Sequence, residues 1–178
     1  MQLVLRPHSS VARPQWEVSG SVKRAGRLIT WSMEVRGPKE LPWNTDARFG
    51  SDIRKNWELW NFDVVEAFLQ LRPTPDAVGA PYLEVQISPL KQGLALVILE
   101  PRKAYYTPLN VVWHAQNSVA PGHWKTSVEL ELPSDFPEGD LWGGLFACLG
   151  VGERNFYALN PNPEARPDFH RPELFRPL

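Results

Sequence analysis

The sequence predicts an all-β fold in one domain, a β-sandwich or barrel. Most of the chain divides into segments of strand length, in which apolar and polar residues alternate or apolar residues run without a break. Turns rich in proline, glycine and asparagine separate these segments at near-regular spacing, which is typical of sandwiches and barrels. The chain holds 18 prolines, which argue against long helices, and its 178 residues are 43% hydrophobic, enough for one sizeable core. We therefore expect residues 1–178 to form a single domain.

The first third of the chain predicts a hairpin followed by a loop. Residues 16–22 and 28–37 are expected to be strands on either side of a turn at 23–27. In the second segment Ile29 and Trp31 alternate with polar neighbours, a period of two. Residues 38–51 are expected to be a loop, because proline, asparagine, aspartate and glycine recur there.

Three strands are expected in the middle of the chain. Residues 63–71 are compatible with strand or helix, and the flanking loops and two adjacent valines favour strand. Residues 81–89 alternate strictly and are bounded by proline at both ends. Residues 93–101 form a continuous apolar run, which suits a strand buried on both faces.

Four more segments complete the predicted fold. Residues 105–118 are expected to form a strand interrupted by a proline, and residues 123–133 alternate cleanly. Residues 140–152 contain glycines that fit a bend or a close approach of backbones, and residues 155–161 are expected to be a last short strand.

Composition excludes several classes of function. Net charge is -1 and the basic residues are scattered, so no nucleic-acid partner is expected. The single cysteine, Cys148, rules out an intrachain disulfide and a cysteine metal cage, and its apolar surroundings predict a small buried side chain. Residues 1–10 do not form a signal peptide and no segment reaches membrane-spanning length, so we expect a cytoplasmic protein without membrane contact.

Four segments, residues 59–69, 82–90, 144–150 and 156–175, carry a family resemblance. They resemble a bacterial DOMON-like family, which is similar to the family-9 carbohydrate-binding modules. The shared positions are Leu59, Trp60, Asp63, Glu66, Phe68, Tyr82, Glu84, Ser88, Pro89, Ala158, Leu159, Pro161, Pro167, Asp168, Phe169, His170 and Phe175. The resemblance implies an antiparallel β-sandwich of jelly-roll type.

The resemblance also implies a sugar site. In family-9 modules two tryptophans sandwich one sugar ring, and polar side chains bind its hydroxyls. Trp60 stands near the position of the first tryptophan, whereas Leu159 stands where the second would be. The residues expected to bind the ligand are Trp57, Trp60, Asp63, Glu66, Glu84 and Asn160.

Each of these residues also has a structural interpretation. Trp57 and Trp60 are either stacking platforms or packed aromatic residues. Asp63 and Glu66 are three apart on a strand and point to opposite faces, which argues against joint acid–base catalysis. Each carboxylate is expected to accept hydrogen bonds from a sugar hydroxyl or from loop N–H groups. Together with Glu84 they are also compatible with a calcium site, although no cofactor is required.

The C-terminal tail contains the triplet Asp168, Phe169 and His170, which we interpret as a structural plug. A proline-rich segment makes no ladder, so its backbone groups need side-chain partners, which Asp168 and His170 supply. Phe169 and Phe175 are expected to anchor the segment on the core. The histidines lack metal-ligand spacing, and no metal site is predicted.

The sequence thus predicts a non-catalytic domain that binds a small carbohydrate or another polar ring ligand. The alternative is a protein-interaction or structural domain whose sugar site has decayed, for which Leu159 argues. A haem-binding DOMON domain lacks support, because Met33 is the only internal methionine and lies in a regular strand. A hydrolase lacks a paired acid and base.

Overall fold

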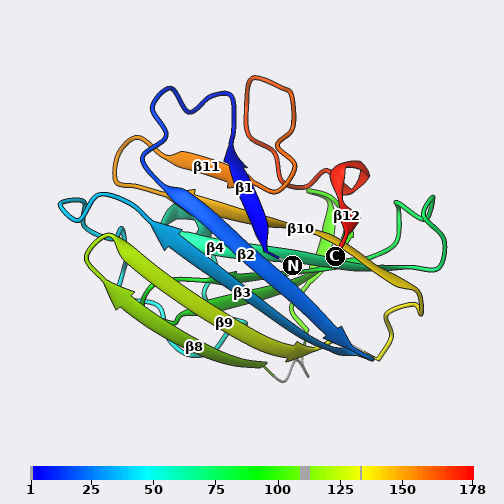
Figure 1. The fold of residues 1–178 in the computed structure, drawn as a ribbon. Helices are drawn as coiled ribbons and strands as arrows, with labels where there is room; N and C mark the ends of the chain where they lie inside the picture. Colours follow the sequence, from blue (N-terminus) through cyan, green and yellow to red (C-terminus); the bar gives the residue numbers. More distant parts are fainter. Residues whose placement is uncertain (1, 109–112, 133) are drawn as a thin grey trace.

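The computed structural model describes residues 2–108, 113–132 and 134–178, and it is an antiparallel β-sandwich of two layers (Figure 1). The predicted fold class is therefore confirmed. The strands of the front layer are β2 (Glu17–Ala25), β3 (Leu28–Arg36), β9 (His123–Glu131) and β8 (Trp113–Ala120). The strands of the rear layer are β7 (Ala104–Tyr106), β6 (Gly93–Glu100), β5 (Tyr82–Ile87), β4 (Val64–Arg72), β10 (Asp140–Leu149) and β11 (Asn155–Ala158).

A first strand, β1 (Leu3–Pro7), joins the two layers, and the sequence did not predict it. Its first half pairs with β2, where Leu5 lies opposite Val18, and its second half pairs with β11, where Arg6 lies opposite Ala158. The hydrogen-bonded order therefore runs through both layers, from β7 at one end to β8 at the other. The apolar run is only a few residues long, so pattern alone did not distinguish a strand there.

Residues 105–118 do not form one interrupted strand. β7 pairs with β6 at the edge of the rear layer, whereas β8 pairs with β9 at the edge of the front layer. The segment thus crosses from one layer to the other, and residues 109–112 lie outside the described residues. Pro108 precedes that crossing, so the proline marks a change of sheet.

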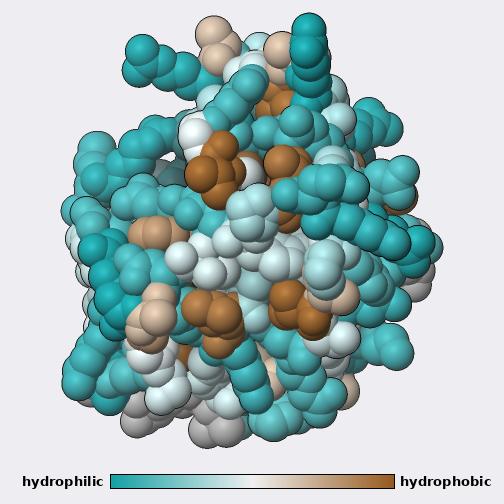
Figure 2. All heavy atoms as spheres, turned by 90° about the vertical axis from the view of Figure 1, so that its left-hand side faces the viewer, coloured by the Kyte–Doolittle hydropathy of each residue, from teal (hydrophilic) through white to brown (hydrophobic). Residues whose placement is uncertain are grey.

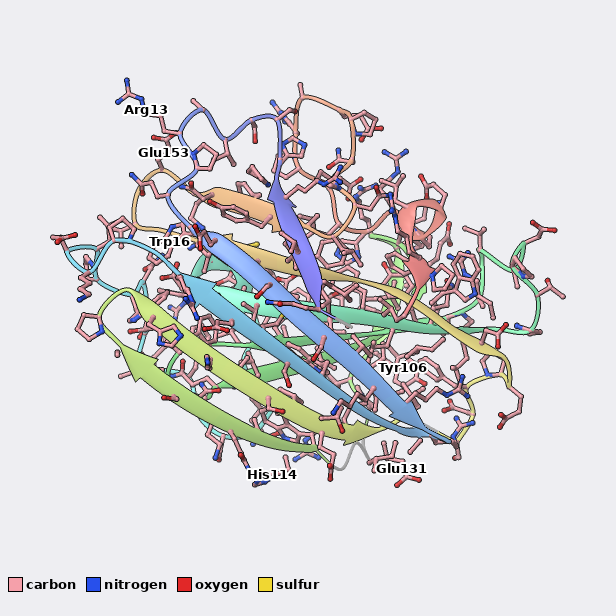
Figure 3. All side chains as sticks on the ribbon, in the orientation of Figure 1. Arg13, Trp16, Tyr106, His114, Glu131 and Glu153 are labelled. Atoms are coloured by element: carbon pink, nitrogen blue, oxygen red, sulfur yellow. The ribbon has the colours of Figure 1, made fainter. Side chains whose placement is uncertain are left out.

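The rear layer is buried on both of its faces, which decides where a site can form. One face packs against the front layer in the main core, which includes Trp31, Trp124, Val85 and Leu145. The outer face carries a second apolar cluster: Leu59, Val64, Phe68, Tyr82, Leu94, Leu96, Ile98, Phe146, Cys148, Ala158 and Phe175. In Figure 3, Arg13 and Glu153 extend outward from loops at one end of the sandwich.

The C-terminal tail closes over part of that outer face. Its last strand, β12 (Arg176–Pro177), pairs with β10, so the prediction that the tail makes no ladder was wrong at its end. The Arg72 guanidinium donates to the Pro172 carbonyl at 2.6 Å. Phe175 is buried in the outer cluster, as the plug interpretation expected of this residue.

The described helices are two 3-10 turns, Leu59–Asn61 and Pro172–Leu174. Within the described residues no helix is long and apolar enough to cross a bilayer. The face shown in Figure 2 is mainly hydrophilic, and its hydrophobic side chains appear as separate spots.

Candidate ligand-binding pocket

The floor of the candidate pocket is the outer face of β4 and β5. Glu66 lies opposite Gln86, and Phe68 lies opposite Glu84, so the alternation of the two strands presents all four side chains on one face. Gln86 donates from Nε2 to Glu84 Oε1 at 2.7 Å. Two acceptors, Glu84 Oε2 and Gln86 Oε1, are buried and have no hydrogen-bond partner among the described residues.

One wall is aromatic. The Trp57 ring stacks on Tyr105, with centroids 5.4 Å apart and planes at 19°, and meets Trp60 edge to face at 4.7 Å. Trp57 remains 47% exposed, which leaves ring surface free for a ligand. The loop that carries both tryptophans is fixed by buried Asn56, which donates to Gly93 O at 2.7 Å and to Gly50 O at 2.8 Å.

The opposite wall is the C-terminal tail at residues 167–170. His170 Nδ1 lies 2.7 Å from the Tyr82 hydroxyl, and Phe169 stacks on Phe146 with centroids 4.4 Å apart. Asp168 accepts a hydrogen bond from the backbone N–H of His170 and forms an ion pair with Arg102. The triplet expected to be a plug therefore anchors the tail and also lines the pocket.

Together these walls enclose a pocket of about 360 Å³. That volume fits a small ring ligand, at the lower end of the range for small-molecule sites. A wider hollow of about 640 Å³ lies over the outer face of the front layer, but polar side chains line it and several of them pair with each other. The pocket on the rear layer combines aromatic walls with unpaired polar groups, so it is the stronger candidate.

The ionisable groups of the pocket are strongly perturbed by burial. Burial raises the pKa of Glu66 well above its usual range, and the neighbouring Glu84 carboxyl raises it further. Burial also raises the pKa of Glu84 to about 7, partly offset by the hydrogen bond from Gln86. Burial lowers the pKa of His170 to about 4, and the nearby Arg102 charge lowers it further, so the imidazole is neutral at pH 7.

Asp63 lies outside the pocket, against the prediction that it binds a ligand. Its carboxylate accepts hydrogen bonds from the backbone N–H of Gly150 at 2.6 Å and of Asn44 at 2.8 Å. Arg154 lies 3.7 Å away. Asp63 therefore takes the second of the two predicted roles, the satisfaction of loop N–H groups.

Asn160 is also separate from the pocket. Its amide donates to Leu174 O at 3.1 Å and its carbonyl accepts from Arg176 at 2.6 Å, so it ties the tail to the end of β11. Leu159 lies beside it, at a small internal void of about 10 Å³. No second tryptophan faces Trp60 from this position.

The three carboxylates considered for calcium are not brought together. Asp63 is bound to loop backbone, while Glu66 and Glu84 line the pocket floor. In the part of the chain that the structure describes, no group of three or more histidine, cysteine or acidic residues is placed to hold a metal ion.

Sequence reasoning missed Gln86, Arg102 and Tyr105. Gln86 follows Glu84 by two positions on an alternating strand, so the period of two placed both on one face and was a sufficient signal. Arg102 and Tyr105 come from the turn between β6 and β7 and from β7. No spacing in the sequence links them to Trp57.

No protein-family model matches the chain. The chain is similar in sequence to UPF0462 proteins. It is 34% identical over 129 residues to the UPF0462 protein C4orf33 homolog of Mus musculus, a match that covers 68% of this chain and 62% of that protein. It is 31% identical over 127 residues to the UPF0462 protein C4orf33 of Homo sapiens, a match that covers 67% of this chain and 59% of that protein. The chain thus spans about three fifths of the length of these relatives.

Two solved structures share the fold. One is a carbohydrate binding module family 9 (CBM9) from Caldicellulosiruptor kristjanssonii in complex with cellotriose, with a TM-score of 0.59 and 14% identity over 98% of this chain and 79% of that one. The same module in complex with glucose gives a TM-score of 0.58 and 14% identity, over 97% and 82%. The fold resembles that of family-9 carbohydrate-binding modules. At this identity the likeness concerns the fold alone.

Proposed function

We propose that the chain is a non-catalytic binding domain and that the pocket on the outer face of the rear layer takes a small carbohydrate or a related polar ring. The observation that carries the proposal is one juxtaposition. The Trp57, Trp60 and Tyr105 rings stand beside a floor on which Glu84 Oε2 and Gln86 Oε1 lack hydrogen-bond partners.

The physical basis is complementarity with a sugar. A sugar ring presents C–H groups on its faces and hydroxyl donors around its edge. Aromatic rings cover the faces, and buried acceptors pair with the hydroxyls. An unpaired buried acceptor costs about 1–3 kcal/mol in the free protein, and a ligand donor removes that cost.

Two further observations support the proposal. Family-9 modules with this fold have been solved with glucose and with cellotriose bound. Tyr105 stacks on Trp57 and supplies an aromatic surface that does not depend on the position of Leu159. Membership of the DOMON-like family, as the sequence motifs imply, is part of the same proposal.

The test is a titration with mono- and disaccharides, followed by intrinsic tryptophan fluorescence and by isothermal calorimetry. Trp57→Ala should weaken binding about 5- to 100-fold, since loss of one stacking ring costs on the order of 1–3 kcal/mol. The matched control is Tyr106→Ala, which removes an exposed aromatic ring of the same strand as Tyr105 that does not line this pocket.

Binding that is equal in wild type and Trp57→Ala would refute the assignment of the pocket. A flat response to every sugar, together with a stable homodimer in light scattering, would favour the alternative interaction domain. Glycosidase turnover that is abolished by Glu84→Gln would refute the non-catalytic assignment.

A further inference from the structure

The buried floor of the pocket presents side-chain oxygen atoms that have no hydrogen-bond partner among the described residues. The amide nitrogen of Gln86 is bonded to Glu84 Oε1. The hydrogen bond between the imidazole of His170 and the Tyr82 hydroxyl engages Nδ1, and Nε2 stays 3.8 Å from Glu84 Oε2, beyond hydrogen-bond distance. These oxygen atoms are Glu84 Oε2 and Gln86 Oε1, and the two residues are only 3% and 1% exposed.

Among the described residues, neither Glu66 nor Glu84 forms a direct ion pair with an arginine or a lysine. Arg102, from the β6–β7 turn, is paired with Asp168 of the tail, and Arg154, from the β10–β11 loop, is closest to Asp63. Glu66 on β4 and Glu84 on β5 lie on diagonal positions of adjacent strands, about 7–8 Å apart at the backbone in this register. Burial favours the protonated form of both carboxyl groups, and the charge of Arg154 offsets this only in part for Glu66. A cation bound directly to the pair would favour the ionised form.

The other ionisable groups of the pocket do not supply that cation. Cys148 on β10 is a buried thiol, and Tyr82 on β5 is a neutral phenol bonded to His170. His170 is neutral at pH 7 because burial and the charge of Arg102 lower its pKa to about 4.

We infer that the ligand of this pocket carries a protonated amino group, as on an amino sugar, which sits on the Glu66 and Glu84 carboxyls beside the Trp57, Trp60 and Tyr105 rings. This inference rests on the proposed function and narrows its ligand class. An ammonium group donates three hydrogen bonds and accepts none, which matches Gln86 Oε1 and the oxygens of the two carboxyl groups once these ionise. Aromatic faces attract cations, and the attraction grows when the site is shielded from water.

The carboxyl pair should lose protons when the amine binds. In the free protein, burial raises the pKa of Glu84 to about 7, and burial together with the Glu84 charge raises that of Glu66 well above its usual range. A bound ammonium favours the ionised form of both groups and lowers these pKa values. Binding at pH 6.5 should therefore release protons to the buffer, whereas binding of a neutral sugar should not.

The experiment compares four probes by isothermal calorimetry at pH 6.5, in two buffers of different ionisation enthalpy. Glucose carries hydroxyls only, glucosamine adds the charge, N-acetylglucosamine removes that charge again, and cyclohexylamine carries the charge without hydroxyls. Glucosamine should bind at least tenfold tighter than glucose and N-acetylglucosamine, with proton release. Glu84→Gln and Glu66→Gln should each reduce this preference to less than threefold.

The matched control is Glu129→Gln, which removes one exposed carboxylate of the front layer and should keep the full preference. Equal affinity for glucose and glucosamine would overturn the inference and leave the proposed function intact. Binding of cyclohexylamine without any sugar would support the ammonium site and refute the sugar assignment. Absence of binding by all four probes would overturn both the inference and the proposed function. The comparison of the four probes uses the wild-type protein alone, so its result does not depend on whether a variant folds.

Discussion

The Tyr82 hydroxyl and the His170 imidazole meet at 2.7 Å, although they are 88 positions apart in the chain. Tyr82 is 1% exposed and its hydroxyl has this partner on the tail, so the bond closes the outer face of β5. The contact explains how a tail of irregular structure holds a fixed position beside a pocket.

His170→Ala should lower the free energy of unfolding by about 1–3 kcal/mol, because the Tyr82 hydroxyl loses its partner in a buried place. Urea unfolding of the variant measures the change. Tyr82→Phe with His170→Ala is the control, since it removes both partners and should cost less than the sum of the two single changes. Additive effects would show that the two side chains do not act as a pair.

The pH dependence of stability should reveal the raised pKa of Glu84. Its pKa is about 7 in the folded protein against 4.5 ordinarily, so the folded state keeps a proton that the unfolded state releases. The contribution of the Glu84 carboxyl to stability is therefore fully present below about pH 4.5 and is lost as the pH rises through 7. Glu84→Gln should therefore make the free energy of unfolding rise more steeply, or fall less, between pH 4.5 and 7, as measured by urea titrations across that range. An unchanged slope would contradict the raised pKa.

His170 should have the opposite effect. Its pKa is about 4 in the folded protein against 6.5 ordinarily, so its contribution is full above pH 6.5 and is lost as the pH falls toward 4. His170→Gln should flatten the loss of stability on acidification between pH 6.5 and 4. The same titrations test this, and a steeper loss in the variant would argue that the imidazole is charged in the folded state.

Asp63→Ala should destabilise the fold without changing the pocket. The carboxylate satisfies two backbone N–H groups, so its removal should cost about 2–5 kcal/mol. Thermal unfolding measures the loss, and ligand affinity measured well below the transition should stay within twofold of wild type. A fall in affinity at unchanged stability would restore the ligand role that the sequence predicted.

Gly143 on β10 should tolerate no side chain. A Cβ there would lie 2.0 Å from the Phe68 carbonyl oxygen, and backbone cannot move aside as a flexible side chain does. Gly143→Ala should cost about 1–3 kcal/mol or more, as overpacked sites do. Gly79→Ala is the control, because nothing lies within 4 Å of that position, and its unfolding midpoint in urea should match wild type. Equal midpoints for both variants would contradict the close approach.

The sequence predicted the strands well because their alternation reports burial directly. In β9 burial follows the expected period of two, whereas β5 and β4, both expected as strands, are buried at every position. The short strand β1 was missed. The change of layer between β7 and β8 could not be predicted, because the residue pattern of a strand does not specify which other strand it pairs with.

The candidate site was predicted in part. One pocket is lined by four of the predicted residues, Trp57, Trp60, Glu66 and Glu84. The side chain of Asp63 is hydrogen-bonded to loop backbone, and that of Asn160 is hydrogen-bonded to the C-terminal tail. The tail was expected as a plug, and residues 167–170 are also a wall of the pocket. Several of these roles depend on contacts between distant segments, such as Asp63 with Gly150 and Tyr82 with His170, which no local pattern contains. Whether any of these residues binds a ligand stays a prediction.

The bridging position of β1 has a consequence for the order of folding. Its second half lies against β11, so Pro7 pairs with Tyr157 across nearly the whole chain. Contacts of such sequence separation form late and slow the overall reaction. On that side β1 stays unpaired until residues 155–158 have taken their place beside it. Closure of the sandwich is then a late step of folding, and until it occurs the unpaired edge of β1 is open to pairing with another chain.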